Sequence, residues 1–267
     1  MSIRISAALA LVRLGRFLQS LPVVILRPSD IADFNSQWYD KASVSYGVLN
    51  KSDMGLTGEE QDCLHQLPKH GRKLLIIGAG GGREVLAFGQ QEYQITGVDF
   101  SQGMLNLAEQ TAADHGISFQ AMEGEISQLN LPENCWDVAW ISRFLYSSIF
   151  TRQRRIATLQ TLHKLLRKEG ILITWFTMEA RARETRRAFL LRKTIAWLTL
   201  GNTAYETGDK LVANSEIIHA FTNKEALVDE FTAGGFELLK MSFFDHELRG
   251  YAVLRSSLRN RPGSPIL

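Results

Sequence analysis

From residue 73 onward, short apolar runs alternate with longer amphipathic segments. The apolar runs predict strands over 73–78, 94–99, 117–122, 136–142, 170–176 and, in two pieces, 236–254. The amphipathic segments predict helices over 82–90, 102–115, 152–168, 179–199 and 223–234. Because strands that alternate with helices form a parallel sheet covered on both faces, the pattern predicts an α/β fold with a ligand crevice at the carboxyl ends of the strands.

The first 69 residues follow a different pattern, which predicts a helical cap. Within 5–21, Arg13 and Arg16 lie roughly opposite a row of leucines at helical spacing, which predicts an amphipathic helix that ends near Pro22. The two arginines interrupt the apolar run, so we expect no transmembrane segment. This helix could pack on the main domain, cover a site as a lid, or contact a membrane surface through 5–21.

Composition places the chain among ordinary globular proteins. It has 267 residues, of which 45% are hydrophobic and 22% charged, which predicts one domain with appendages. The net charge of +2 is too small to indicate a nucleic-acid partner. Cys63 and Cys135 are the only cysteines, and they form no CxxC pair, so we expect neither a metal site nor a disulfide framework, and a cytoplasmic location.

A glycine-rich loop follows the first predicted strand. It reads Gly78-Ala79-Gly80-Gly81-Gly82, and Asp99 ends the next strand. Glycine permits φ > 0 and lets a ligand approach the backbone closely, and an acid at the end of the second strand can bind ribose hydroxyls. The loop therefore predicts a nucleotide-type cofactor site, although Asp99 could instead cap the helix that follows it.

The residues after the loop exclude two cofactor classes. Arg83 stands where a dinucleotide fingerprint needs a small residue, which disfavours NAD. A phosphate-binding P-loop needs lysine and a hydroxyl residue at the helix entry, and Arg83 and Glu84 stand there instead.

Over residues 70–255 the chain resembles the class I S-adenosylmethionine-dependent methyltransferases. The motifs that carry the resemblance lie in order at 75–84, 98–108, 119–132, 136–142, 162–176, 221–227 and 234–237. The resemblance implies a Rossmann-like fold, with a mostly parallel seven-stranded sheet and helices on both faces. It also implies an N-terminal helical cap (1–69), a methyltransferase domain (70–255) with a substrate-cap insertion (178–220), and a C-terminal tail (256–267).

The resemblance also implies that the cofactor is S-adenosyl-L-methionine and indicates the residues that bind it. It assigns Asp99 to the ribose, Phe100 and Met104 to the adenine ring, and Glu125 to the adenine amino group. The full expected set is Gly78, Ala79, Gly80, Gly82, Asp99, Phe100, Met104, Glu125, Ile126, Ser142, Tyr39 and Tyr46.

The methyl group of a sulfonium donor is already activated, so the protein must align the acceptor, exclude water and in some cases remove a proton. The candidate catalytic residues are His219, Tyr146 and Arg143. Imidazole has a suitable pKa for a base, but a structural histidine at the end of a segment is the other interpretation of His219. The Asn/Asp-Pro-Pro-Tyr/Phe motif of enzymes that methylate amide or base nitrogens is absent after the fourth strand.

The predicted substrate cap is basic. Between residues 181 and 193 a single acid, Glu184, accompanies Arg181, Arg183, Arg186, Arg187, Arg192 and Lys193. These cations could lie in water on a surface helix or recognise an anionic substrate. We predict a methyltransferase acting on a small-molecule O, N or S acceptor; the alternatives are an RNA or protein methyltransferase that uses the basic cap, and a non-catalytic S-adenosylmethionine-binding regulatory protein. The sequence assigns no oligomeric state.

Overall fold

The structure is a computed structural model, and it describes most of the chain. The described residues are 3–35, 37, 55–64, 66–67, 73–126, 128–143, 145–179, 184–212, 216–246 and 248–257. Tyr39, Tyr46, Arg181 and Arg183 lie outside the described residues, as do the side chains of Arg13 and Arg16.

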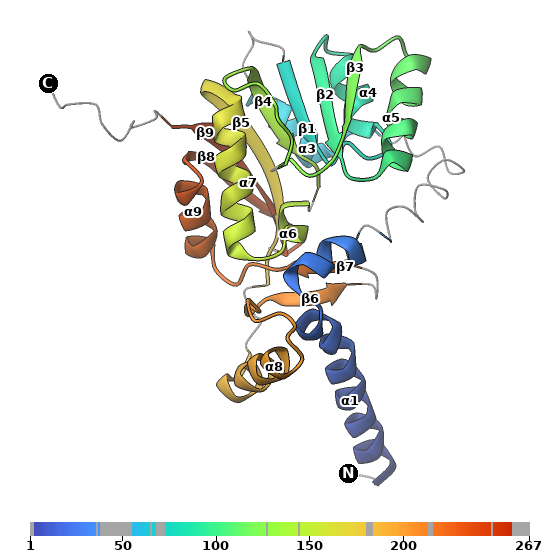
Figure 1. The fold of residues 1–267 in the computed structure, drawn as a ribbon, viewed down its shortest axis with the longest axis vertical. Coiled ribbons are helices and arrows are strands. Elements are labelled where there is room, and N and C mark those ends of the chain that lie inside the picture. The colour runs from blue at the N-terminus through green and yellow to red at the C-terminus, as the bar shows by residue number, and fades with distance from the viewer. Residues whose placement is uncertain are drawn as a thin grey trace, which may run out of the picture.

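A seven-stranded sheet forms the centre of the main domain (Figure 1). Its strands are β1 (Lys73–Ile77), β2 (Gln94–Asp99), β3 (Phe119–Glu123), β4 (Trp136–Ile141), β5 (Leu166–Thr177), β8 (Phe236–Phe244) and β9 (Arg249–Ser256). Their order is β3-β2-β1-β4-β5-β9-β8; β1 to β5 pair in parallel, and β9 is antiparallel to both of its neighbours. The predicted fold class is confirmed.

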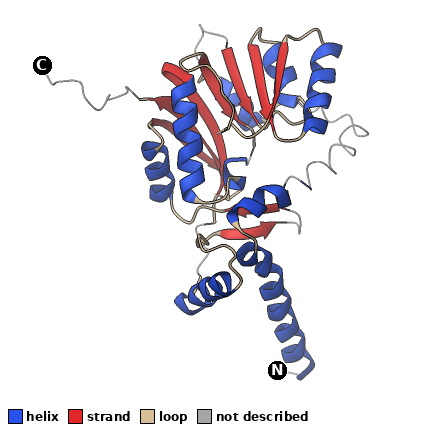
Figure 2. Ribbon diagram, viewed as in Figure 1, coloured by secondary structure: helices blue, strands red, loops and turns tan. Residues whose placement is uncertain are grey.

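Helices cover both faces of this sheet (Figure 2). Because successive side chains of a strand point to opposite faces, Leu75 and Ile77 join one core, and Leu74 and Ile76 join the other. The first core lies against α7 (Arg152–Leu165) and α9 (Lys224–Ala233), beside the short α6 (Leu145–Ser148). The second core lies against α3 (Gly58–Leu64), α4 (Arg83–Gly89) and α5 (Gln102–Asp114).

The start of β5 differs from the sequence prediction. We expected the preceding helix to reach residue 168 and the strand to begin at 170, but β5 begins at Leu166. Leu166 is buried and pairs with Trp136, and a register shift separates this pair from the next, Val138 with Ile171. Burial of Leu166 in the core therefore outweighs the helical pattern of the sequence around it.

Two segments that are distant in sequence form a cap beside the sheet (Figure 1). The first contains α1 (Ile3–Ile25) and a helix over 28–35; the second contains α8 (Arg186–Leu198) and a hairpin of β6 (Asp209–Val212) and β7 (Glu216–His219). They share a small core that includes Val23, Val24, Ile31, Ala196, Tyr205 and Ile217. The sequence pattern did not indicate this hairpin.

The α1 helix continues through Pro22, where the sequence predicted its end. Proline removes a backbone donor and its ring crowds the carbonyl four residues earlier, but burial of Val23 and Val24 in the cap core outweighs this cost and stabilises one further turn. By length and composition α1 could cross a membrane, since an 18-residue window has a mean hydropathy of 1.5. Only 12% of that window is buried, and core helices and signal sequences pass the same test. The absence of a transmembrane segment therefore stays a prediction.

Candidate cofactor and acceptor site

A cavity of about 1200 Å³ opens at the carboxyl ends of the parallel strands. Ile77, Asp99 and Ser142 line it where β1, β2 and β4 end, and Ala32 and Asn35 line it from the cap. This is the edge of the sheet where the strand pattern predicted a ligand crevice.

The glycine loop forms one wall of the cavity, and two of its positions require glycine. Gly78 has a φ of 78°, and a Cβ there would lie 2.7 Å from Cδ2 of Leu145. Gly82 has a φ of 89°, and its Cβ would lie 2.9 Å from Cα of Ala108 in α5. A side chain at either position would therefore force the loop away from its neighbours.

Asp99 links the glycine loop to β2. Its carboxylate accepts hydrogen bonds from the backbone N–H groups of Gly80 (2.9 Å) and Ser101 (3.0 Å), and the residue is only 9% exposed. Ser101, rather than Asp99, caps α5, because its hydroxyl accepts from the N–H of Met104 (3.3 Å). The capping role considered for Asp99 therefore belongs to its neighbour.

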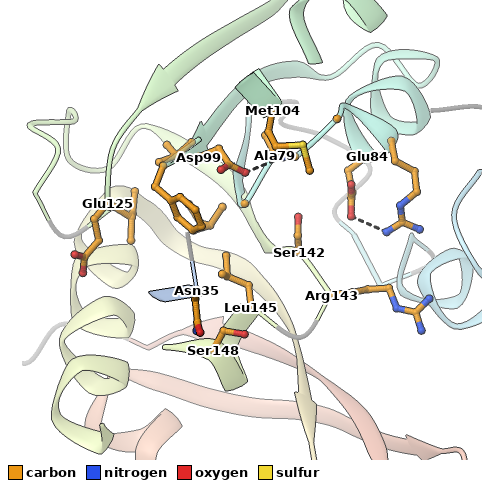
Figure 3. Close-up of a pocket in the computed structure, with 18 of the residues that line it drawn as sticks. Asn35, Ala79, Glu84, Asp99, Met104, Glu125, Ser142, Arg143, Leu145 and Ser148 are labelled. Atoms are coloured by element: carbon orange, nitrogen blue, oxygen red, sulfur yellow. Dashed lines mark hydrogen bonds and ion pairs between the residues drawn. The ribbon is translucent and has the colours of Figure 1, made fainter. Parts of the chain in front are cut away.

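Several predicted cofactor residues gather on this side of the cavity. Figure 3 shows Asp99, Met104 and Glu125 on one side, with Ser142 between them and Glu84. Phe100 is partly exposed and also lines the cavity, and the half-exposed Glu125 lies 3.9 Å from the guanidinium of Arg154. The cavity lining includes Gly78, Ala79, Gly80, Asp99, Phe100, Met104, Glu125, Ile126 and Ser142; Gly82 is not among the lining residues but packs against α5.

A charged cluster that the sequence did not indicate lies on the opposite side. Arg83 donates two hydrogen bonds to the carboxylate of Glu60, both 2.7 Å long, and a third, also 2.7 Å, to Glu84. Burial raises the pKa of Glu84. Burial also acts to raise the pKa of Glu60, but the hydrogen bonds from Arg83 and from the N–H of Thr57 outweigh it and lower that pKa. The sequence could have suggested this cluster only through the Thr-x-x-Glu pattern at 57–60, which begins α3.

Of the three candidate catalytic residues, the structure places only Arg143 on the cavity. Tyr146 is fully buried and donates a hydrogen bond to Glu230 (2.8 Å), and burial raises its pKa well above the ordinary value. Glu230 in turn accepts two hydrogen bonds from Arg155, of 2.9 and 2.8 Å. Tyr146 therefore faces a buried ion pair and not the cavity.

His219 ends β7 and also lies away from the described cavity lining. Its Nδ1 is 2.8 Å from Asp209 and 3.8 Å from Glu206, and its ring packs edge-on against Phe221. Three ligand atoms of His219, Asp209 and Glu206 lie within 4.8 Å of one another, which is close enough to hold a metal ion. However, Arg155 already donates (3.2 Å) to the Glu206 oxygen that faces His219, so that oxygen has a partner within the protein.

Comparison with known proteins assigns the domain that carries this cavity. Residues 74–170 match the family described as "Methyltransferase domain". Residues 74–170 therefore belong to a methyltransferase domain of the class I S-adenosylmethionine-dependent kind. An uncharacterised methyltransferase of Bacillus subtilis, YodH, is 25% identical over 128 residues. That alignment covers 48% of this chain and 53% of YodH, so the chain matches about half the length of this relative.

Solved structures share the fold of the methyltransferase domain. An S-adenosylmethionine-dependent methyltransferase of Methanosarcina mazei superimposes with a TM-score of 0.59 at 19% identity, over 77% of this chain and 100% of that chain. One from Clostridium acetobutylicum gives 0.58 at 14% identity, over 82% and 99% of the two chains. The [4+2]-cyclase SpnF gives 0.55 at 17% identity, over 75% and 80%. At these identities the likenesses show the fold alone, and SpnF, a cyclase, has the same fold.

The cavity of the methyltransferase domain fits S-adenosylmethionine. Asp99 would offer a carboxylate to the ribose, and Glu84, on the other side, would offer a hydrogen-bond acceptor to the amino group of the methionine end (Figure 3). Between them, the buried Oγ of Ser142 has no hydrogen-bond partner within the described part of the chain, and a bound polar ligand could supply one. The cofactor supplies an activated methyl group.

Proposed function

We propose that the chain transfers the methyl group of S-adenosylmethionine to an O, N or S atom of a small molecule. The observation that carries this proposal is the extent of the cavity. At about 1200 Å³ it exceeds the usual size of a pocket for one small ligand, and it continues past the cofactor residues to the cap. Asn35 and Ser148 lie at that end (Figure 3).

The arginines of the cavity lining favour an anionic acceptor. Arg143, Arg154 and Arg249 all line the cavity, and a guanidinium group pairs well with a carboxylate or phosphate. Asn35 fixes the wall of this region, because its side chain exchanges two 2.9 Å hydrogen bonds with the backbone of Ile217 in β7. A wall fixed in this way supports the alignment of an acceptor that in-line methyl transfer requires.

The basic helix α8 does not contribute to this cavity. None of the described residues of 184–212 lines it. An RNA or protein acceptor bound through α8 would therefore need to reach the cavity from outside the cap, so this location favours the small-molecule acceptor.

Cofactor binding is tested by calorimetric titration of the purified chain with S-adenosylmethionine and with NAD. We expect heat only with S-adenosylmethionine. Asp99→Ala should weaken its binding roughly 10- to 150-fold, because a hydrogen bond to a charged group contributes about 1.5–3 kcal/mol. Asp229→Ala, on the exposed face of α9, is the matched control and should bind normally. Equal affinities of the two variants would remove Asp99 from the site.

Methyl transfer is tested by measuring S-adenosylhomocysteine production with a panel of anionic and neutral small molecules. We expect turnover with an anionic member of the panel and its loss in Arg143→Ala. Cofactor binding without turnover on small molecules, RNA or protein would instead support the regulatory alternative. Turnover on RNA, falling steeply with added salt, would support the polymer acceptor.

A further inference from the structure

The first three turns of α1 are mostly apolar and exposed. Every described side chain from Ile3 to Leu14 is exposed, and most are Ile, Leu, Val or Ala. Figure 1 shows this end of α1 projecting from the cap. A contiguous run of exposed apolar side chains typically marks a surface that a partner or a membrane covers, and the described fold does not cover this one.

A second exposed apolar surface lies on α8 and the turn after it. Trp197 is 69% exposed and Leu200 is 71% exposed. Leu190, Leu191 and Leu198 are exposed as well. The helices α1 and α8 meet in the cap core, where Val24 packs near Ala196. We call the exposed residues of α1 and α8 the cap surface. None of them lines the cavity.

The charged residues of α1 and α8 are all positive. Neither 1–29 nor 185–205 contains an aspartate or glutamate, whereas Arg4, Arg186 and Arg187 are exposed on the cap surface. Arg192 and Lys193 are held within the cap, by Glu184 and by the carbonyl of Thr203. Exposed apolar side chains, a tryptophan and unopposed cations together match the headgroup region of an anionic bilayer. The same cations would repel each other across an interface between two copies of the chain.

We propose that the cap surface docks the protein on an anionic lipid bilayer, with α1 lying in the headgroup region. Arg13 and Arg16 fall near the middle of α1, where a spanning orientation would place them at the bilayer centre at high cost. In an interfacial orientation, long arginine side chains reach the headgroups. The helix over 28–35, which follows α1, lines the cavity through Ala32 and Asn35, so docking places the catalytic domain beside the lipid surface.

The test is co-sedimentation of the full chain with vesicles of phosphatidylcholine alone and vesicles in which about a third of the lipid is phosphatidylglycerol. We expect binding to the anionic vesicles that weakens at high salt. Arg187→Glu should lower the partition coefficient roughly 5- to 30-fold, and Trp197→Ala should lower it as well. Lys168→Glu, a charge reversal at an exposed position in β5, is the matched control and should bind like the parent. Thermal unfolding of each variant verifies that it is folded.

Two results would overturn the proposal. One is the absence of binding to anionic vesicles, or binding that Arg187→Glu and Trp197→Ala leave unchanged. The other is a concentration-dependent dimer in sedimentation velocity without lipid, disrupted by Trp197→Ala, which would show that a second copy covers the cap surface. Neither result bears on methyl transfer, because the cap surface and the cavity share no residue.

Discussion

Replacing Glu230 with glutamine should destabilise the fold strongly, because it removes half of a buried ion pair. The side chains of Glu230 and Arg155 are only 2% and 1% exposed. Glu230 accepts from Nε and Nη2 of Arg155 and from the hydroxyl of Tyr146, at 2.9, 2.8 and 2.8 Å. Burial lowers the pKa of Arg155, but the bonds to Glu230 outweigh it and raise the pKa, so the guanidinium stays charged.

The magnitude follows from the charge that the substitution leaves behind. Removing one partner of a buried pair costs about 3–5 kcal/mol. Glu206 remains 3.2 Å from Arg155 and is partly exposed, so we expect the lower end, about 3 kcal/mol. At roughly 2 °C per kcal/mol for a chain of this size, Glu230→Gln should melt about 6 °C below the parent.

Circular dichroism during thermal and urea unfolding measures this loss. Two controls separate the charge from other effects. Tyr146→Phe removes one hydrogen bond but leaves the ion pair, so it should destabilise by less. Glu225→Gln, at an exposed position in the first turn of α9, should change stability by less than about 0.5 kcal/mol. If Glu230→Gln and Tyr146→Phe had the same free energy of unfolding, Glu230 would not be needed to stabilise the buried charge of Arg155. That result would refute the reasoning.

Three further predictions concern single side chains. Gly82→Ala should cost about 2 kcal/mol or more in urea unfolding, because of its positive φ and the close approach of α5, whereas Gly81→Ala, with open space around its Cβ, should cost little; equal losses would contradict this. Burial raises the pKa of the Cys63 thiol to about 12, so a maleimide at neutral pH should label the half-buried Cys135 and reach Cys63 only after unfolding; equal labelling rates would contradict this. Burial raises the pKa of Glu84, so the folded chain retains a proton over a pH range in which the unfolded chain releases it, and stability falls as pH rises through that range; Glu84→Gln, which does not titrate, should therefore gain stability relative to the parent as pH rises above the ordinary pKa of glutamate, and a pH-independent difference would contradict this.

The sequence predicted those parts of the fold that local pattern determines. Successive side chains of a strand in this sheet point into two different cores, so the whole strand is apolar. The apolar run from Leu74 to Ile77, followed by a glycine loop, therefore predicts a buried strand from the sequence alone. The loop and Asp99 were identifiable for a similar reason. The loop needs the backbone freedom of glycine, and Asp99 needs only to stand at the end of the next strand. Both features can be recognised from residues that are close together in the sequence.

The parts that the sequence did not predict depend on contacts between distant residues. Arg83 stands out in the sequence only as a departure from the dinucleotide fingerprint, and its partner Glu60 is 23 residues earlier. The β6–β7 hairpin pairs two four-residue strands whose stability comes from the cap core, so their own pattern was too short to read. The path of α1 beyond Pro22 depends on the same core.

The positions of His219 and Tyr146 follow from a chain of buried polar contacts that joins the cap to the methyltransferase domain. Tyr146 in α6 contacts Glu230 in α9, which pairs with Arg155 in α7; Arg155 in turn reaches Glu206, and Glu206 lies 3.8 Å from His219 at the end of β7. A hydroxyl and an imidazole near the ends of strands look the same in a sequence whether they face a cavity or a buried carboxylate. A satisfied network in a low-dielectric interior resists displacement. It can therefore hold the cap in one orientation above the cavity, and that orientation determines where Asn35, which is hydrogen-bonded to β7, lines the cavity.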